Sequence, residues 1–187
     1  GPTHQPVEHL MSLRLIPNVD VIRPSNSIEM NHSYRYAFSD SKNPKVLSLT
    51  RQDLDYLDID VKYDEFIKGG YVVSDGDDFT IIASGSELEI AFKIKAALLE
   101  YSIRIVSVPI LNKLSNMKNE EINELLKNKN VFPIELGRSI GWESYLGRLT
   151  KTFSIDTFGE SAPIEDLEKN FGFDIPSITK EIIKYLN

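Results

Sequence analysis

Residues 79–108 read FTIIASGSELEIAFKIKAALLEYSIRIVSV, and this stretch predicts a strand, a helix and a second strand in succession. Its two ends, 79–83 and 103–108, are short apolar runs of the kind that form buried strands. Between them, Ser86 and the glutamate three residues later have the spacing of a capping box, which predicts a helix that continues to about Tyr101. A strand, a helix and a strand in this order are typical of a parallel α/β sheet.

Strands and helices continue to alternate on both sides of this stretch. The cluster Asp75-Gly76-Asp77-Asp78 separates the apolar runs 71–74 and 79–83, which predicts a β-hairpin. Other apolar runs and helical periodicities predict further elements. These are strands at 19–22, 45–50 and 131–136, helices from Pro6, over 26–38 and over 113–128, and two more helices near the carboxyl end, beginning close to Pro163 and Pro176.

The predicted fold class is α/β, with two lobes of mostly parallel sheets flanked by helices and one antiparallel hairpin strand in the C-terminal domain. Periodicity fades over 53–70, where alternating aspartates lead to Gly69-Gly70, and this pattern indicates a linker. We therefore expect one domain over 1–65 and a second over 66–187.

The composition excludes several classes of protein. The chain has 187 residues, which fits one domain or two small lobes, and no cysteine, which excludes disulfides, thiol catalysis and cysteine zinc sites. Its 21 basic and 28 acidic side chains give a formal charge of −7, which argues against nucleic acid as a partner. No apolar run approaches the roughly 18 residues of a membrane span, so no membrane association is expected, and the lack of cysteine suits a cytoplasmic protein.

His4 is the first candidate functional residue. It lies in a loop between Pro2 and Pro6, and its imidazole titrates near neutral pH and can donate a hydrogen bond to a reacting oxygen. The alternative interpretation is an ordinary surface or capping histidine. His9 follows five residues later, a spacing that does not place both rings on one helical face as metal ligands, so no zinc site is predicted.

Arg51 is the second candidate functional residue. It follows the predicted strand 45–50, at the edge of an open α/β sheet where ligands commonly bind. The fixed fork of guanidinium donors suits a phosphate or a carboxylate. The alternative interpretation is a surface ion pair with a neighbouring aspartate.

Seven short strings follow one another along nearly the whole chain: GPTHQPVEHL (1–10), IPN (16–18) with RP (23–24), LTRQ (49–52), KGGY (68–71), ASGSE (83–87), VSVP (106–109) and FGESAP (158–163). In these residues and in their order the chain resembles the transketolase family. The Gly-Pro-Thr-His-Gln-Pro form of the first string separates it from pyruvate dehydrogenase-type and deoxyxylulose phosphate synthase relatives. Because the strings span nearly the whole chain, the resemblance is specific.

The resemblance implies that the chain corresponds to the C-terminal part of a transketolase. That part comprises the end of the pyrimidine-binding domain, to about residue 65, and the whole C-terminal domain. Intact transketolases are homodimers of the pentose phosphate pathway that use thiamine diphosphate and Mg²⁺ to transfer a two-carbon ketol unit between ketose and aldose phosphates. By resemblance, His4 corresponds to a catalytic histidine near the reacting carbon. Arg51 likewise corresponds to an arginine that binds the terminal phosphate of the sugar.

Several features of the family lie outside this sequence or differ in it. An aspartate that contacts a substrate hydroxyl, the glutamate that activates the cofactor, and the whole domain that holds Mg²⁺ and the diphosphate would precede Gly1. Asn26 replaces the usual aspartate after the Arg-Pro pair. The expected partners are therefore sugar phosphates and the missing N-terminal part of the same enzyme. Residues 1–187 alone are expected to bind no cofactor and to be inactive.

Other functions also fit the sequence. The domain after about residue 70 has no catalytic cluster of its own, which suits a structural, dimerisation or regulatory module. A separate half-subunit of a split transketolase, or part of a dihydroxyacetone synthase, fits as well. The chain begins with Gly1 instead of methionine and lacks the regions of a signal peptide, so we expect a fragment or a processed product.

Overall fold

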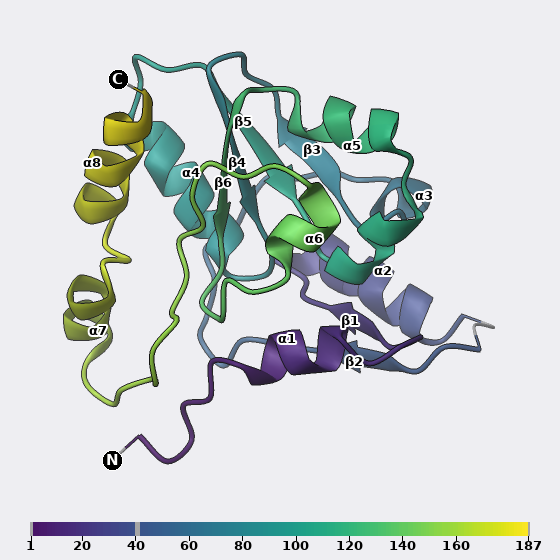
Figure 1. Cartoon of the computed structure of the whole chain (residues 1–187). Helices are drawn as coiled ribbons and strands as arrows, with labels where there is room; N and C mark the ends of the chain where they lie inside the picture. The colour runs from purple at the N-terminus through teal and green to yellow at the C-terminus, as the bar shows by residue number, and fades with distance from the viewer. Residues whose placement is uncertain (1, 40–41, 187) are drawn as a thin grey trace.

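The computed structural model describes residues 2–39 and 42–186, so Gly1 of the amino-terminal string lies outside the described residues. Two separate sheets are present, with helices around them (Figure 1). A parallel pair has the order β1-β2, and a larger mixed sheet has the order β3-β5-β4-β6. The strands are β1 (Asp20–Ile22), β2 (Lys45–Leu47), β3 (Tyr71–Ser74), β4 (Phe79–Ala83), β5 (Ile103–Ser107) and β6 (Asn130–Ile134).

Helices connect most of these strands, and three of them follow the last strand. Within the described residues, none is both long enough and apolar enough to cross a membrane. In chain order they are α1 (His9–Arg14), α2 (Ser27–Ala37), α3 (Tyr63–Phe66), α4 (Glu87–Ala97), the 3₁₀ helix η1 (Leu111–Asn116), α5 (Asn119–Leu126), α6 (Trp142–Leu146), α7 (Ile164–Phe171) and α8 (Ile175–Leu186).

The strand-helix-strand unit at 79–108 forms the centre of the larger sheet. Strand β4 pairs in parallel with β5 and with β6, so that Ile81 lies opposite both Ile105 and Phe132. Every residue of β4 is buried, as its continuous apolar run predicts for a parallel strand covered on both faces. The predicted α/β class with mostly parallel sheets is confirmed.

The antiparallel strand β3 pairs with β5, and not with β4 as the predicted hairpin requires. The segment 75–78 lies against the start of β5, where Asp75 pairs with the guanidinium of Arg104 and Gly76 packs directly on the backbone. Helix α4 then returns the chain so that β5 enters the sheet between β3 and β4. One antiparallel strand is thus confirmed, but the hairpin prediction is wrong.

Two hydrophobic clusters cover the two faces of the larger sheet. Ile81 and Ala83 face a cluster that includes residues of α4 and α8, which lie side by side in Figure 1. Ile82 faces the opposite cluster, together with residues of η1, α5 and α6. This alternation follows from the strand period of two residues. Trp142, at the start of α6, is fully buried in the second cluster.

Several helix boundaries differ from the predicted ones. Helix α4 ends before Tyr101, and the Ser86 side chain makes no capping hydrogen bond. The helix predicted from Pro6 begins only at His9. The single helix predicted over 113–128 is divided into η1 and α5. By contrast, the helix predicted over 26–38 is confirmed as α2, and at its start the Asn26 side chain accepts the backbone N–H of Glu29.

Candidate functional site

His4 lies in the loop that leads into α1, and its side chain is exposed. Its ring atom Nδ1 is 2.9 Å from the hydroxyl oxygen of Thr3. When that hydroxyl donates to Nδ1, the ring proton lies on Nε2. In this tautomer Nε2 can donate a hydrogen bond to a ligand oxygen, which is the chemistry that the sequence predicts for His4.

The His4 loop forms one wall of a cavity of about 260 Å³. Much of the rest of the lining is apolar and comes from the lobe that contains the larger sheet: Ile90 of α4, Leu136 and Ile155 of loops, and Ile164, Leu167 and Phe171 of α7. Helix α7 has no buried residue, and its apolar side chains stay exposed or half-buried along this hollow. The cavity therefore lies between the predicted catalytic loop and the C-terminal lobe.

Arg51 does not line this cavity. Its side chain is exposed, and the preceding residues Leu49 and Thr50 line a separate hollow beside α2. Arg51 has no ion pair with any carboxylate in the part of the chain that the structure describes, so the alternative of a surface pair with a neighbouring aspartate is not observed. The structure thus leaves the guanidinium open to solvent and does not bring it into contact with His4.

A buried carboxylate, Glu135, joins the amino-terminal segment to the larger sheet. It lies directly after β6 and is 1% exposed. Arg14 donates two hydrogen bonds to it, at 2.7 and 2.8 Å, and Arg23 donates a third at 2.9 Å. Ser84 and the indole N–H of Trp142 also donate to it, each at 2.9 Å. The two arginines therefore connect α1 and the end of β1 to the larger sheet.

Burial by itself would raise the pKa of Glu135, because a charged carboxylate loses its hydration. The charges and hydrogen bonds of Arg14 and Arg23 outweigh this effect and lower the pKa from 4.5 to about 2. Arg23 also pairs with Glu87, at 3.0 Å, and the carboxylate of Glu87 accepts the backbone N–H of Leu136. Glu135 is consequently ionised at neutral pH and paired with Arg14 and Arg23.

A second buried carboxylate, Glu29, makes a separate connection between α2 and the larger sheet. It accepts the hydroxyl of Tyr71 at 2.7 Å and the hydroxyl of Ser107 at 2.6 Å, both from the larger sheet. Within its own lobe it accepts the backbone N–H and the hydroxyl of Ser25. Burial, and then the negative charge of Glu29, raise the pKa of Tyr71 well above its ordinary value. This tyrosine therefore stays protonated and acts as a hydrogen-bond donor.

Sequence reasoning did not identify Glu135 or Glu29 as buried. A signal existed for Glu135, because an acidic residue at the end of the apolar run 131–136 must either leave the sheet or find a cation. Its partners Arg14 and Arg23 lie more than a hundred residues earlier, and no local pattern pairs them.

The described residues do not fit a magnesium diphosphate group. None of the His, Asp and Glu side chains in residues 2–39 and 42–186 form a cluster of three or more that could hold a metal ion. The acidic side chains that line the His4 cavity are Glu160 and Glu168, which would repel a diphosphate. Thiamine diphosphate and Mg²⁺ therefore cannot be assigned to a site within these residues.

Two family models match the chain. The model of the transketolase pyrimidine-binding domain matches residues 1–55. The model of the transketolase-like C-terminal domain matches residues 69–174, which is more than half of the chain.

Curated relatives of the chain are transketolases. A transketolase of Bacillus subtilis is 37% identical over 199 residues, an alignment that covers 100% of this chain and 30% of the relative. A chloroplastic transketolase of Zea mays is 36% identical over 188 residues, covering 95% of this chain and 28% of the relative. The chain thus spans less than a third of the length of these relatives.

Solved structures agree with the sequence relatives. A transketolase from Leishmania mexicana has a TM-score of 0.89 at 33% identity, covering 100% of this chain and 28% of that one. A split-gene transketolase, described as an inactive beta4 tetramer, has a TM-score of 0.81 at 20% identity, and the alignment covers 100% of this chain and 64% of that one. This match shows a similar fold. Models of two transketolase domains match the two parts of this chain, and the Leishmania mexicana transketolase aligns with all of its structure. This chain therefore belongs to the transketolase family.

Proposed function

We propose that residues 1–187 act as the C-terminal part of a transketolase that transfers a two-carbon ketol unit from a ketose phosphate to an aldose phosphate. The observation that carries the proposal is the position of His4, which belongs to the family's amino-terminal string and forms the wall of a solvent-accessible cavity. Thiamine diphosphate, held with Mg²⁺ by the rest of the intact enzyme, would supply the electron sink for the two-carbon unit.

In this proposal His4 donates a hydrogen bond from Nε2 to an oxygen of the sugar next to the reacting carbon. Negative charge develops on such an oxygen during bond cleavage, and a fixed donor stabilises it more in the transition state than in the ground state. The contact between Nδ1 and the Thr3 hydroxyl supports this role, because it orients the ring, and the ring proton lies on Nε2 when the hydroxyl is the donor.

Arg51 binds the terminal phosphate of the same sugar in this proposal. Its guanidinium is exposed and free of ion pairs within the described ranges, so it needs no rearrangement to accept a phosphate. Fixing the far end of the sugar orients the carbon chain toward His4, which reduces the entropy lost in reaching the transition state. To contact both His4 and Arg51, one substrate molecule must reach from the cavity lined by His4 to the separate hollow lined by the residues just before Arg51.

Replacing Arg51 by alanine in the intact enzyme should raise the KM for a phosphorylated aldose acceptor by roughly 10- to 100-fold, the effect of losing a charge-assisted hydrogen bond. The KM for an unphosphorylated aldose should stay unchanged. Steady-state kinetics with both acceptors measure this difference. Arg148→Ala is the matched control, because Arg148 is also exposed but lies after α6. Equal losses for both acceptors would reject the phosphate-binding role.

The rest of the enzyme supplies the cofactor in this proposal, either in the same chain or in a separate subunit. Residues 1–187 alone should therefore bind no thiamine diphosphate, because the described residues hold no group of three or more metal-ligating side chains and the His4 cavity is lined by two glutamates and no lysine or arginine. Isothermal calorimetry with thiamine diphosphate and Mg²⁺ measures this directly. Heat of saturable binding would contradict the expectation.

The domain boundary near residue 65 is part of the same proposal. The matched regions, 1–55 and 69–174, end and begin on either side of it, and the two sheets also lie on either side. We propose a homodimer for the intact enzyme, on the basis of family membership. The cytoplasmic location and the absence of nucleic acid and membrane partners stay predictions from the sequence.

A further inference from the structure

We propose that the C-terminal lobe positions the catalytic loop, and that Gly159 is the positioning residue. Gly159 lies in the loop before α7 and supports the backbone of Gln5, the residue next to His4. The inference rests on the proposed role of His4, and it gives the C-terminal lobe a part in catalysis although that lobe contributes no reacting group.

The contact between Gly159 and Gln5 leaves no room for a side chain. A Cβ atom at position 159 would lie 2.5 Å from the carbonyl oxygen of Gln5 and 2.8 Å from its Cβ. Gly159 is buried, whereas its neighbours Phe158 and Glu160 are exposed. Its φ angle is not positive, so the backbone conformation does not require glycine there. The close approach to the catalytic loop is what requires it.

A second contact holds the loop just beyond. The backbone N–H of Arg138 donates to the carbonyl oxygen of Val7 at 3.0 Å. The loop of Arg138 is tied to the segment before Gly159, because the N–H of Ile155 donates to the carbonyl of Gly137 and the guanidinium of Arg138 donates to the carbonyl of Asp156 at 2.6 Å. The segments 137–138 and 155–159 therefore form one support for the catalytic loop.

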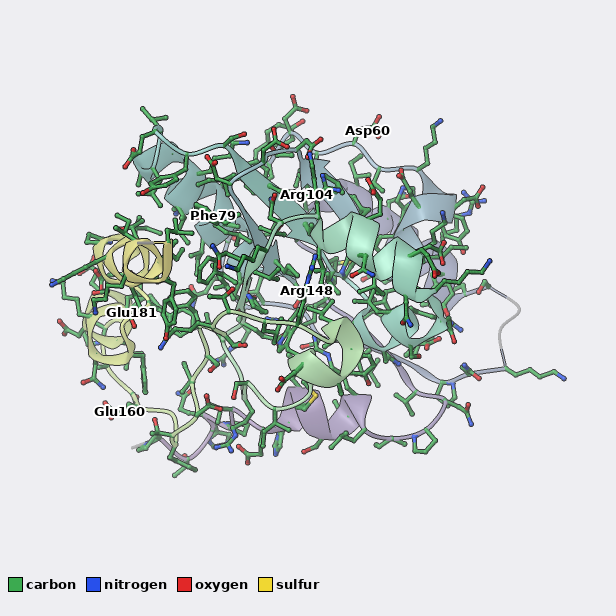
Figure 2. All side chains as sticks on the ribbon, turned by 45° about the horizontal axis from the view of Figure 1, so that its top comes forward. Asp60, Phe79, Arg104, Arg148, Glu160 and Glu181 are labelled. Atoms are coloured by element: carbon green, nitrogen blue, oxygen red, sulfur yellow. The ribbon has the colours of Figure 1, made fainter. Side chains whose placement is uncertain are left out.

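His4 has little support of its own. Its side chain is exposed, and its hydrogen bond among the described residues is to the adjacent Thr3. Figure 2 shows Glu160 on the loop before α7, at the same end of the molecule as the amino-terminal segment. Because a residue in the loop cannot hold a fixed position without contacts, the support from the other lobe determines where the imidazole lies.

The Gly159→Ala variant of the intact enzyme tests the inference. The added methyl group must displace the Gln5 backbone, and a displacement approaching 1 Å in a positioned group can cost up to about 100-fold in rate. We expect kcat to fall roughly tenfold, with the KM for phosphorylated sugars changed less than about twofold, because Arg51 lies outside this contact.

Gly147→Ala is the matched control. Gly147 has a φ of 74°, so alanine there is strained and destabilises the protein, but no atom lies within 4 Å of the added methyl. This variant should have a lower unfolding temperature and the kcat of the parent. A similar loss of kcat in both variants would show that lost stability causes the effect, and would overturn the inference.

A double-mutant cycle with His4→Ala distinguishes this inference from the proposed function. If Gly159 acts through His4, Gly159→Ala should lower kcat by less than about twofold in the His4→Ala background. A full tenfold loss in that background would overturn the positioning role and leave the role of His4 standing. If His4→Ala by itself leaves kcat unchanged, the proposed function of His4 fails instead.

Hydrogen exchange gives a readout that does not depend on the reaction. In Gly159→Ala the amides of the segment 5–11 should exchange faster than in the parent, and Gly147→Ala should leave them unchanged. Mass spectrometry of the intact enzyme measures both. Parental exchange in Gly159→Ala, combined with parental kcat, would show that the loop does not depend on this contact.

Discussion

Replacing Glu135 by glutamine should lower the free energy of unfolding by about 3–5 kcal/mol, the usual cost of removing one partner from a buried ion pair. Glutamine keeps the size of the side chain but leaves Arg14 buried without a counter-charge. The Arg14 side chain is 0% exposed, and Glu135 is its ion-pair partner among the described residues. Arg23 keeps Glu87, so most of the cost arises at Arg14. Urea unfolding followed by circular dichroism measures the change.

The matched control for this variant is Glu89→Gln. Glu89 pairs with Lys93 on α4, where the lysine side chain is 53% exposed and the glutamate side chain is 18% exposed. A pair that water reaches on the lysine side contributes about 1 kcal/mol or less, because water screens the charges and the side chains lose entropy. A loss at Glu135 no larger than the loss at Glu89 would show that the junction between the lobes does not depend on this carboxylate.

The same carboxylate makes stability depend on pH in the acid range. Because the pKa of Glu135 falls from 4.5 to about 2 on folding, the unfolded chain binds more protons than the folded one between these values. Its contribution is complete above about pH 4.5 and is lost as the pH falls toward 2. The Glu135→Gln variant should therefore show a shallower loss of stability than the parent over this interval. Parallel acid profiles would contradict the assignment.

Replacing His4 by alanine in the intact enzyme should lower kcat by roughly 100-fold, the usual effect of removing one hydrogen-bond donor from a developing oxyanion. The KM for phosphorylated sugars should change little, because Arg51 retains the phosphate. His4→Asn should recover part of the loss, since an amide can also donate to the substrate oxygen. Steady-state kinetics with a ketose phosphate donor measure both values.

His9→Ala is the control for the histidine. His9 is exposed on α1 and lines a separate shallow hollow with Ser12, Leu13 and Ile16, so it should keep the kcat of the parent. If His4→Ala has a kcat within about threefold of the parent, the hydrogen-bonding role of His4 is wrong. A loss shared equally by His9→Ala would instead indicate that the amino-terminal segment tolerates no change.

The strand-helix-strand unit could be predicted because its signals are local. The apolar runs that form β4 and β5 are continuous, and the helix between them is apolar around much of its circumference. The pairing of β3 could not be predicted, because a turn-rich segment fixes only that the chain changes direction. Contacts with β5, which follows later in the chain, decide its neighbour. The capping prediction at Ser86 failed for a similar reason, since Glu89 binds Lys93 and the backbone of Asp55 instead.

For the candidate site, the sequence could propose only residues that lie in short local strings. His4 and Arg51 were identified from short motifs, and their exposure is compatible with ligand binding. The support from Gly159 was not identified, although that glycine lies in one of the family strings. Position 159 requires glycine because it closely approaches Gln5, a residue more than a hundred and fifty positions away. Only the folded structure shows this approach.

The most direct test of the account is a crystal structure of the intact enzyme with a ketose phosphate bound. The account predicts that one sugar molecule contacts both residues: Nε2 of His4 within hydrogen-bond distance of an oxygen beside the reacting carbon, and the guanidinium of Arg51 on the terminal phosphate. A sugar phosphate bound with either side chain directed to solvent, away from the ligand, would contradict the account.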